Sequence, residues 1–348
     1  MKTWLITGGA GFIGSNFVRI SSRNPGIRLI ILDALTYAGN LANISDLLMM
    51  PNVVFVKGDV CDSELVIGLF EEYGITHVIH FAAESHVDRS ILGARPFITT
   101  NIEGTFTLLE AARKNWMTGK DKLFLHVSTD EVYGSLAPQD PPFNENSPYQ
   151  PNSPYSSSKA AADHLVRAWH HTYDLPTIIS NCSNNYGPWQ FPEKLIPLII
   201  MNALEEKELP IYGDGLQVRD WLHVEDHCHA LLRIIEQGAI GQTYTIGANQ
   251  ERTNLYIVQK ICSTVDILKG RPQGATSRLI KHIADRPGHD RRYAIDSTRL
   301  QKELGWRALH IFEETLPDVV SWYIAHKDWA DTIRTGEYLH YYQRQYGE

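Results

Sequence analysis

Two groups of residues in the middle of the chain have the types and spacing that chemistry requires. The first is Thr129-Asp130-Glu131, and the second is Tyr155 followed by Lys159 four positions later. A phenol beside an ammonium group can take the proton of an alcohol while hydride leaves it. The two adjacent acids exceed what that step needs, which favours a further proton-moving step. Taken alone, however, an acidic pair after a strand is commonly a solvated turn.

A glycine-rich turn near the N-terminus predicts a dinucleotide site. Gly8, Gly11 and Gly14 follow an apolar strand-like run and open a helix. Glycine lets the backbone turn tightly and approach a pyrophosphate, and the helix N-terminus offers free N–H groups to that anion. Asp33 ends the next predicted strand, where a carboxylate accepts both adenosine ribose hydroxyls and repels a 2′-phosphate. We therefore expect NAD rather than NADP, with Asp59 near the adenine.

The spacing of Tyr155 and Lys159 places both side chains on one face of a predicted helix. The Lys159 ammonium and the positive charge of oxidised nicotinamide are expected to lower the pKa of the phenol from about 10. That change would make Tyr155 a usable base near neutral pH. The pattern gains weight because it follows a dinucleotide turn and the strand-end pair Ser128-Thr129.

Short apolar, β-branched runs alternate with helical patterns through the first half of the chain. The predicted strands are Trp4–Thr7, Leu29–Leu32, Val53–Val56, His77–Phe81, Leu123–Val127 and Thr177–Ser180. Such alternation is typical of a parallel sheet covered on both faces. Pro96 begins one predicted helix, and Ser153 is the predicted N-cap of another, with Pro154 its first residue. The predicted fold class is α/β, a Rossmann-like doubly wound parallel sheet with a smaller mixed α/β substrate-binding domain.

The strict alternation stops after Asn185-Tyr186-Gly187-Pro188. We therefore predict an NAD-binding domain over residues 1–187, to which 220–248 returns, and a substrate-binding domain over 188–348. The proline-rich connection from Gly134 to Ser153 is compatible both with a functional loop and with a plain surface connection.

Composition excludes several classes of function. The chain has 348 residues, of which 43% are hydrophobic, and its net charge of −8 argues against nucleic acid as a partner. No cationic leader with a long apolar stretch precedes Trp4, so we expect a cytoplasmic protein that does not bind a membrane. The four cysteines lie far apart and are expected to be reduced. His223, His227 and His229 lack a nearby closing ligand, so no metal is expected.

Segments along nearly the whole chain resemble the extended short-chain dehydrogenase/reductase family. They are Thr7–Gly14, Asp33 with Leu35–Asn40, Ala82–Ser90, Ser128–Gly134, Tyr155–Lys159, Asn181–Pro188, Pro192–Pro197, Arg219–Trp221 and Asp285–Tyr293. The triplet Thr129-Asp130-Glu131 resembles the family's nucleotide-sugar dehydratases, because its sugar epimerases share the Tyr/Lys pair without the two acids. The resemblance implies a lyase of deoxysugar biosynthesis that converts nucleotide-activated glucose, with dTDP as the expected carrier, to a 4-keto-6-deoxy sugar. NAD is expected to stay tightly bound and to be recycled.

The implied chemistry gives each catalytic residue a task. Tyr155 takes the proton of the C4 hydroxyl, which Thr129 holds in line, while hydride passes to NAD. By resemblance, Glu131 then removes the C5 proton and Asp130 protonates the departing C6 hydroxyl, after which hydride returns to C6. Asp130 must start protonated and Glu131 ionised, so repulsion and unequal burial must drive their pKa values apart.

The binding residues are likewise implied by the resemblance. Those expected at NAD are Gly8, Gly11, Phe12, Ile13, Gly14, Asp33, Leu35, Thr36, Asp59, Val60, Ala82, Ala83, Ser85, Thr100, Tyr155, Lys159 and Asn185. Those expected at the nucleotide sugar are Ser85, Thr129, Asn184, Lys194, Leu195, Pro210, Ile211, Tyr212, Arg219, Asn254, Asp285, Arg286 and His289. Arg291 and Arg292 are compatible with ligand contacts or with surface charges. The chain departs from the family at Ala34, where Lys is frequent, and at His223, where Tyr is usual.

Three alternatives remain from the sequence. They are a UDP-glucose 4,6-dehydratase, a nucleotide-sugar 4-epimerase that leaves Asp130 and Glu131 idle, and a catalytically silent NAD-binding regulator. Degraded catalytic positions would favour the regulator, and none is degraded. The helices at Pro96 and Pro154 are expected to pair with those of a second copy in a homodimer, although their apolar faces could equally pack internally.

Overall fold

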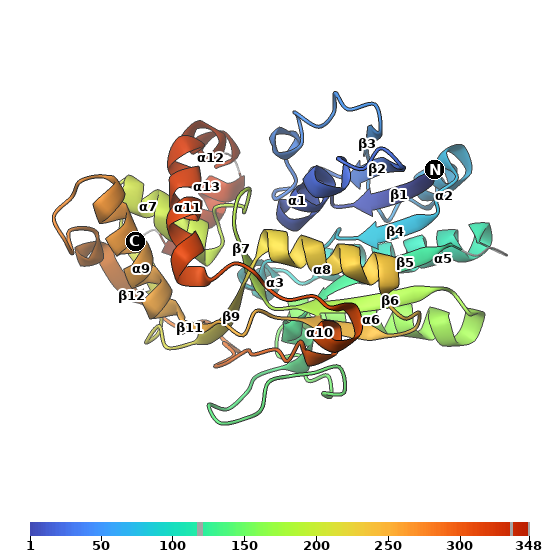
Figure 1. Cartoon of the computed structure of the whole chain (residues 1–348). Helices are drawn as coiled ribbons and strands as arrows, with labels where there is room; N and C mark the ends of the chain where they lie inside the picture. The colour runs from blue at the N-terminus through green and yellow to red at the C-terminus, as the bar shows by residue number, and fades with distance from the viewer. Residues whose placement is uncertain (117–120, 335–336, 347–348) are drawn as a thin grey trace.

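A seven-stranded sheet forms the larger of the two lobes in Figure 1 and has the strand order β10-β6-β5-β4-β1-β2-β3. The computed structural model describes residues 1–116, 121–334 and 337–346. The strands of this sheet are β1 (Lys2–Thr7), β2 (Ile27–Asp33), β3 (Val53–Lys57), β4 (His77–His80), β5 (Leu123–Thr129), β6 (Thr177–Cys182) and β10 (Thr243–Ile246). All neighbouring strands pair in parallel. The predicted Rossmann-like fold is confirmed.

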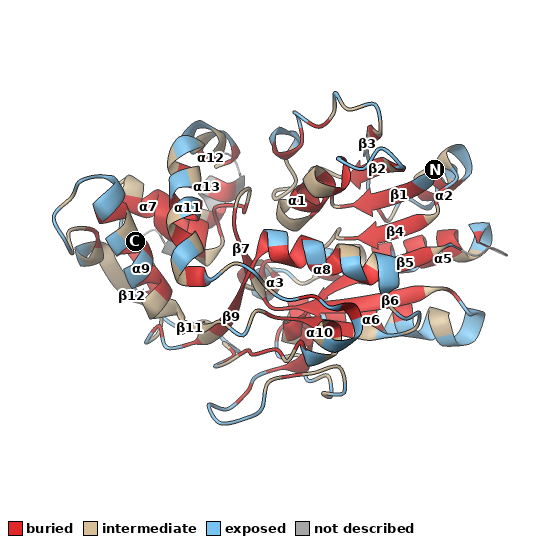
Figure 2. Cartoon of the chain, viewed as in Figure 1, coloured by how far each residue is buried: buried red, intermediate tan, exposed pale blue. Residues whose placement is uncertain are grey.

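Helices cover both faces of the sheet because its strands carry apolar side chains on alternate sides. In β1, Trp4 and Ile6 belong to one core, whereas Leu5 belongs to the core on the opposite face. The first core is covered by α1 (Phe12–Ser21), α8 (Val224–Gln237) and α10 (Thr298–Leu304), and the second by α2 (Ser63–Tyr73), α5 (Gly104–Asn115) and α6 (Pro154–Tyr173). Figure 2 shows the resulting buried strands between helices with exposed outer faces.

The helix predicted from Pro96 consists of three parts. A single turn, α4 (Arg95–Phe97), leads into a π-helix, η2 (Ile98–Glu103), and then into α5. Inside the π-helix, Asn101 Nδ2 donates to Glu84 O at 3.0 Å and to Ser158 Oγ at 2.8 Å. These inward bonds favour the wider turn, so the expectation of one regular helix is wrong in detail. Such turns are rare and frequently lie at functional sites.

The helix α6 begins where the sequence predicts. Ser153 Oγ accepts a hydrogen bond from Ser156 N at 3.0 Å, and Ser156 Oγ accepts one from Ser153 N at 3.0 Å. This reciprocal capping box satisfies two donors that a helix start leaves free. The predicted N-cap is thus confirmed, and it fixes the start of the helix that carries Tyr155 and Lys159.

The smaller lobe has a hydrophobic core of its own. Its elements are α7 (Leu195–Leu204), α9 (Asn254–Leu268), α11 (Phe312–Ala325), α12 (Lys327–Ile333), α13 (Glu337–Tyr346) and the paired strands β8 (Leu209–Tyr212) and β12 (Ile280–Ile283). A second sheet of β7 (Asn184–Tyr186), β9 (Val218–His223) and β11 (Glu251–Thr253) lies between the lobes in Figure 1. Short helical segments complete the chain: η1 (Leu41–Asn43), α3 (Val87–Leu92), η3 (Asp130–Tyr133) and η4 (Thr276–Leu279).

One segment departs from the predicted division at residue 188. Leu300, Leu304 and Trp306 pack into the core of the larger lobe beside α8 and β10. Their apolar side chains complete that core, so residues 298–306 lie with the larger lobe although the predicted boundary assigns them to the other domain.

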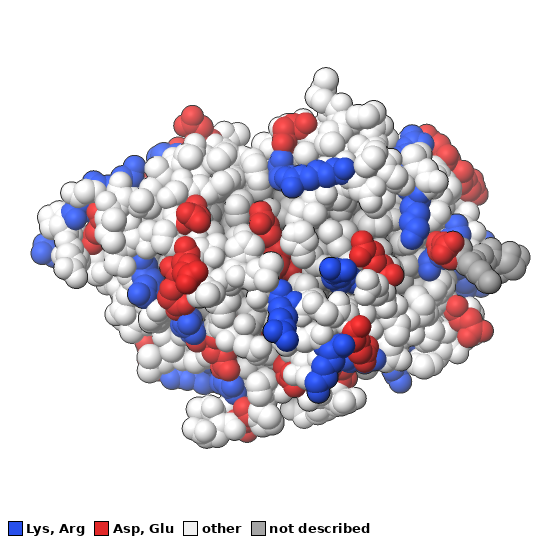
Figure 3. Space-filling model, viewed as in Figure 1, with Lys and Arg blue, Asp and Glu red and all other residues white. Residues whose placement is uncertain are grey.

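The surface carries charges of both signs. Figure 3 shows basic and acidic side chains interspersed over the face drawn there, and several form exposed ion pairs, such as Arg299 with Glu303 at 3.0 Å. Across the described ranges, no helix has both the length and the apolar character that crossing a membrane requires.

Candidate active site

The glycine turn after β1 closes against the neighbouring strand end. Gly8 has a φ of +68°, and a Cβ atom there would lie 2.7 Å from Ala82 N. A Cβ atom at Gly14 would lie 2.2 Å from Gly8 O. Neither position tolerates a side chain, which brings the start of α1 close to the β-strand ends. Gly11 is the N-cap of α1 and supplies no side-chain cap, so backbone donors of the first turn are free for an anion.

Asp33 ends β2 with a buried carboxylate that backbone groups hold in place. Oδ2 accepts from Ala10 N at 2.9 Å, and Oδ1 accepts from Leu35 N at 2.8 Å. Burial raises the pKa of Asp33, and the two backbone bonds oppose that rise. Each oxygen retains acceptor capacity for a hydroxyl group. Leu35, which the sequence places at NAD, therefore orients Asp33. The next residue, Thr36, is also expected at NAD and lines the cavity itself.

A single cavity runs from the glycine turn to the acidic triplet. The predicted NAD residues that line it are Gly8, Gly11, Phe12, Ile13, Gly14, Asp33, Thr36, Asp59, Val60, Ala82, Ala83, Ser85, Thr100, Tyr155, Lys159 and Asn185. The predicted substrate residues that line it are Ser85, Thr129, Asn184 and Lys194, and Asp130 and Glu131 lie on the same wall. The proposed cofactor residues and the proposed catalytic groups thus line the same cavity.

The acidic triplet begins at the last residue of β5 and continues into η3. Thr129 Oγ1 accepts from Glu131 N and donates to Asp130 Oδ1, both at 3.3 Å. Because the carboxyl end of a parallel strand lies at the ligand-binding edge of such a sheet, all three side chains meet the cavity.

The two acids have different electrostatic surroundings. Burial and the neighbouring Glu131 charge raise the pKa of Asp130 well above its usual value, against the opposing effect of Arg219. Burial also raises the pKa of Glu131, but three cations, Arg286, Lys194 and Arg219, oppose that rise. Asp130 therefore holds a proton more strongly than Glu131, which is the order that an acid and a base require.

The expected lowering of the Tyr155 pKa is not produced by the groups of the chain itself. Burial raises the pKa of Tyr155 well above its usual value, and the charge of Glu131 adds to that effect. Lys159 Nζ donates to Val127 O at 2.9 Å, and burial lowers the pKa of Lys159 to about 8. The expected effect of the protein groups on the pKa of Tyr155 therefore has the wrong sign, because spacing along a helix does not reveal burial.

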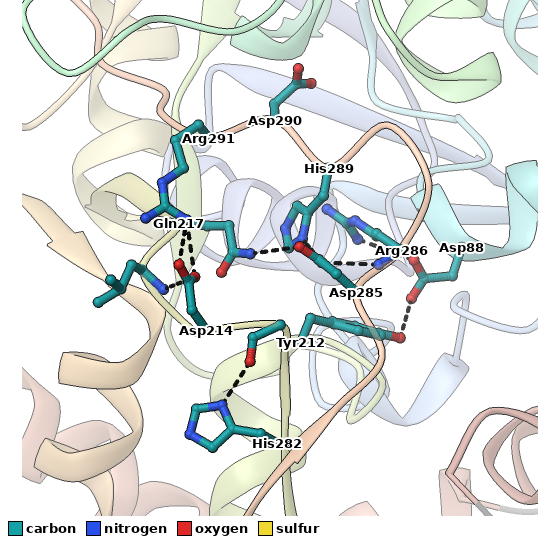
Figure 4. Close-up of polar contacts among 12 residues, drawn as sticks. Asp88, Tyr212, Asp214, Gln217, His282, Asp285, Arg286, His289, Asp290 and Arg291 are labelled. Atoms are coloured by element: carbon teal, nitrogen blue, oxygen red, sulfur yellow. Dashed lines mark hydrogen bonds and ion pairs between the residues drawn. The ribbon is translucent and has the colours of Figure 1, made fainter.

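A polar cluster between α3 and the smaller lobe brings together several predicted substrate residues (Figure 4). Arg286 Nη1 lies 3.1 Å from Asp88 Oδ1, and Tyr212 OH donates to Asp88 Oδ2 at 3.0 Å. His289 Nδ1 contacts Asp285 Oδ1 at 2.5 Å. The cluster presents a guanidinium, an imidazole and a phenol within one region, as recognition of a charged, ring-containing ligand requires.

Two further cations also oppose the rise in the pKa of Glu131. Lys194 Nζ donates to Ser85 O at 2.8 Å at the cavity wall. Arg219 is buried, donates to Asp290 O at 3.0 Å, and stacks over the Tyr293 ring at 4.3 Å. Its charge acts on both acids and so links the smaller lobe to the triplet.

Other predicted substrate residues lie outside the cavity. Ile211 is buried in the smaller lobe's hydrophobic core, and Leu195 packs against that core. Pro210 precedes Ile211 on β8, where the backbone pairs with β12. Asn254 begins α9, and its side-chain oxygen is buried without a hydrogen-bond partner among the described residues.

The basic stretch divides into different roles. Arg291 pairs with Asp214 at 2.9 Å, and Arg292 pairs with Glu251 at 2.6 Å. Of these two arginines, the first is half-exposed and faces away from the Asp88 cluster in Figure 4.

Sequence reasoning did not select several residues that line the cavity. Glu193 is buried, and Arg89 Nε lies 3.1 Å from its Oε2. Gly39 lies so close to Asp33 that a Cβ atom would be 2.5 Å from Oδ1. The neighbours Gln190 and Phe191 also line the wall. Glu193 and Gly39 fall inside segments that match the family, so the resemblance carried a signal for both.

The histidines with metal-like spacing do not converge. His227 Nδ1 lies 3.0 Å from Asn185 Oδ1, whereas the ring of His223 stacks on His310 at 4.1 Å. His223, Glu225 and His310 bring ligand-type atoms within 4.8 Å of one another. Stacked imidazoles direct their nitrogen lone pairs alongside each other, and a metal needs lone pairs that converge.

The sheet, the glycine turn, Asp33 and the Tyr155/Lys159 helix together define an extended short-chain dehydrogenase/reductase. A family model described as GDP-mannose 4,6 dehydratase matches residues 5–319. The dTDP-glucose 4,6-dehydratase of Xanthomonas campestris pv. campestris (strain B100) is 53% identical over 344 residues, which span 97% of each chain. The chain belongs to the dTDP-glucose 4,6-dehydratase family.

Solved structures of the same family have the same fold. The dTDP-glucose 4,6-dehydratase of Bacillus anthracis str. Ames, in complex with NAD, superposes with a TM-score of 0.86 at 44% identity and covers 96% of this chain and 100% of its own. DesIV, the dTDP-glucose 4,6-dehydratase of Streptomyces venezuelae, with NAD and TYD bound, gives 0.88 at 43% identity over 95% of this chain and 99% of its own.

Proposed function

We infer that this chain catalyses the NAD-dependent 4,6-dehydration of dTDP-glucose to the 4-keto-6-deoxy sugar. The observation that carries the inference is the pair of buried Asp130 and half-buried Glu131 on the same cavity wall as Tyr155. An enzyme that only oxidises or epimerises at C4 has no use for two further acids of unequal proton affinity. Relatives that are about half identical in sequence carry the same activity in their names, which supports the inference.

The cavity fits NAD. Gly8 and Gly14 leave a backbone cradle that a Cβ atom would fill, the first turn of α1 has free donors, and Asp33 offers carboxylate oxygens for the ribose. When bound there, NAD accepts hydride from C4 and gives it back at C6. Solved relatives that contain NAD support this assignment.

Each catalytic side chain then moves or holds one proton. Tyr155 removes the proton of the C4 hydroxyl, and Thr129 accepts or donates a hydrogen bond to keep that hydroxyl in line. The C4 ketone acidifies the C5 hydrogen, which Glu131 removes as a proton. Asp130 gives its proton to the C6 hydroxyl, which leaves as water, and C5 is reprotonated after C6 has been reduced. The sugar loses one water and NAD is unchanged.

The nucleotide is proposed to bind where the two lobes face each other. Three cations, Arg286, Lys194 and Arg219, act on Glu131, and Arg286 also pairs with Asp88 in the cluster of Figure 4. We assign these cations to the diphosphate and Tyr212 to the nucleoside. This supports the proposed division into an NAD-binding domain over 1–187 with 220–248, and a nucleotide-sugar-binding domain over most of 188–348.

One experiment separates the proposal from its alternatives. The purified protein is incubated with dTDP-glucose or UDP-glucose in deuterated water, and the product is followed by mass spectrometry and NMR. Dehydration of dTDP-glucose predicts loss of one water, deuterium at C5 and no accumulating reduced nicotinamide. A product of unchanged mass with inverted C4 would identify an epimerase instead. If UDP-glucose reacts faster than dTDP-glucose, UDP-glucose becomes the proposed substrate.

We also propose a homodimer formed through the helices at Pro96 and Pro154. Leu92, Ile98, Phe106 and Tyr173 on these neighbouring segments are exposed, and Phe106 is 47% exposed. Exposed apolar side chains on adjacent helices favour burial against a second copy. Sedimentation should give twice the mass of the chain, and Phe106→Glu should halve it. Leu309→Glu, at an exposed site elsewhere, should not. A wild-type chain that sediments as a monomer would refute the dimer.

The cytoplasmic location expected from the sequence stays a prediction, which fractionation of the producing cells would test.

A further inference from the structure

A buried carboxylate lies behind the catalytic pair and takes no part in the proton transfers proposed above. Asp163 is on α6, one turn beyond Lys159, and is 1% exposed. Its Oδ2 accepts hydrogen bonds from Ser128 Oγ at 3.0 Å, Tyr149 OH at 2.8 Å and Asn181 Nδ2 at 3.1 Å. The three donors come from β5, from the connection after Gly134 and from β6. This carboxylate is therefore fixed in position and held as an anion.

The second oxygen of Asp163 faces Lys159 by way of a histidine. His126 Nε2 lies 3.2 Å from Asp163 Oδ1 and 3.5 Å from Lys159 Nζ. The other partner of Nζ among the described residues is Val127 O, at 2.9 Å. Both direct partners of the ammonium, an imidazole and a peptide carbonyl, orient it without supplying negative charge.

A buried ammonium needs an anion close by, because burial favours its neutral form. Burial lowers the pKa of Lys159 to about 8, and the charge of Asp163 is the largest effect that raises it. The other titratable groups facing Lys159 are His80 on β4, His126 on β5 and Cys182 on β6. Burial holds the pKa of His80 well below its usual value, lowers that of His126 to about 4 and raises that of Cys182 to about 12, so all three are neutral near pH 7.

Asp163 itself is ionised. Burial raises its pKa, but the interaction with His126, the charge of Lys159 and the bond from Ser128 together outweigh burial and hold the pKa below its usual value. Among the described groups that face Lys159, Asp163 is thus the one that carries a negative charge at neutral pH.

We propose that Asp163 is a positioning residue for the Tyr155/Lys159 pair: its carboxylate supplies the negative charge that keeps the buried Lys159 ammonium protonated and in place. Asp163 acts through Lys159, since the acids that affect Tyr155 directly are Glu131 and Asp130. The inference rests on the proposed function, because it assigns the oxidation at C4 to this pair. It also gives a role to the connection from Gly134 to Ser153, whose Tyr149 bonds Asp163.

The test measures C4 oxidation separately from water loss. dTDP-xylose lacks C6, so it can lose hydride from C4 but cannot lose water, and the absorbance of reduced nicotinamide reports the oxidation alone. In the wild-type holoenzyme, the rate should fall as the pH rises through about 8, where Lys159 loses its proton. Asp163→Asn keeps the shape and hydrogen-bonding capacity of the side chain and removes the charge. In this variant the fall should occur at least about one pH unit lower, which reduces the rate at pH 8 about tenfold relative to its own plateau, against about twofold in the wild type.

Two further variants exclude a merely structural effect. Asp163→Glu retains the charge and should restore the wild-type pH profile. Tyr149→Phe removes one hydrogen bond and leaves the charge, so its rate should fall at the wild-type pH. A uniformly slower Asp163→Asn enzyme with an unchanged profile would overturn the proposal. Should Asp163→Asn fail to fold, a wild-type rate that stays constant between about pH 7 and 9.5 would overturn it as well. A wild-type enzyme that forms no reduced nicotinamide at any pH would contradict the proposed function itself. Failure of the proposed function can therefore be distinguished from failure of the role assigned to Asp163.

Discussion

Asp130 and Glu131 at the edge of the parallel sheet differ from Asp88 and Asp285 in the polar cluster between α3 and the smaller lobe. In the first region burial dominates and raises the pKa of both acids. In the second, burial also raises the pKa of Asp88, but Arg286, His86 and Tyr212 outweigh it and the pKa is lowered. Asp285 is likewise held below its usual value through His289 and Arg286, against burial. Burial thus favours protonation in the first region, most strongly at Asp130, whereas neighbouring cations keep the acids of the second region ionised.

Hydrogen bonding follows the same division. Asp130 Oδ2 is buried without a partner among the described residues. Both oxygens of Asp88 are bonded, Oδ1 to Arg286 and Oδ2 to Tyr212 and Tyr341. This difference fits the proposed roles: a carboxyl group that gives a proton to substrate is left short of donors, whereas a carboxylate beside an arginine that binds an anion keeps that arginine oriented. Binding of a diphosphate would then exchange one anion for another at Arg286.

The largest effect is expected at Tyr155, which belongs to the buried region. Tyr155→Phe removes the base for the C4 hydroxyl and should lower kcat about 10²- to 10⁴-fold, with little change in the NAD content of the purified protein. Stopped-flow absorbance should show that formation of reduced nicotinamide is the step that slows. Tyr133→Phe is the matched control: its hydroxyl bonds Asn181 in the same lobe, and kcat should stay within about threefold of wild type. Equal losses in both variants would remove the special role of Tyr155.

Substitution of each of the two acids should impair a different step. Glu131→Gln should abolish deuterium exchange at C5, whereas Asp130→Asn should mainly slow water loss, each lowering kcat about 10²- to 10⁴-fold. Reduced nicotinamide should accumulate in both variants because C4 oxidation continues. NMR of the product in deuterated water and single-turnover absorbance measure the two effects. Asp140→Asn, on the connection after Gly134, should behave as wild type. Equally mild effects of Asp130→Asn and Glu131→Gln would contradict the separate acid and base roles of the pair.

The sequence predicts the buried region better than it predicts the polar cluster. Short β-branched runs, the glycine turn and the Ser153 cap are local signals, and each of them marks an element that the structure contains. By contrast, Gln190 and Phe191 line the cavity because segments that are distant in sequence meet in the folded chain. Arg286 and Arg291 lie in one basic stretch, but contacts with Asp88 and Asp214, which are distant in sequence, give them different surroundings.

Physical quantities that depend on burial were the least predictable. Spacing correctly placed Tyr155 and Lys159 on one helix but gave the wrong sign for the effect of the protein on the Tyr155 pKa. The π-helix at Ile98–Glu103 was missed for a related reason. Its inward Asn101 bonds the backbone of Glu84, and nothing in the helical periodicity marks that contact.

In the polar cluster, the expected effect is on binding. Arg286→Met should raise KM for dTDP-glucose about 10- to 100-fold with a smaller change in kcat, because a charge-assisted hydrogen bond contributes about 1.5–3 kcal/mol. Arg291→Met, from the same basic stretch, should leave KM unchanged, since that arginine pairs with Asp214 on an exposed surface. Steady-state kinetics of the two variants measure the difference. Similar KM values for both would mean that the cluster around Asp88 is not the diphosphate site.

The smallest effects should come from matched helix caps in the two lobes. Ser153 Oγ caps α6 by accepting from Ser156 N at 3.0 Å, and Thr253 Oγ1 caps α9 by accepting from Tyr256 N at 3.2 Å. Replacing either residue by alanine should lower the free energy of unfolding by about 1 kcal/mol, which denaturant titration can measure. Ser153→Ala should in addition lower kcat, because the first turn of α6 carries Tyr155, whereas Thr253→Ala should leave kcat unchanged. Equal losses of kcat in both variants would show that the position of Tyr155 does not depend specifically on the cap of α6. The contrast between the two regions would then be weaker.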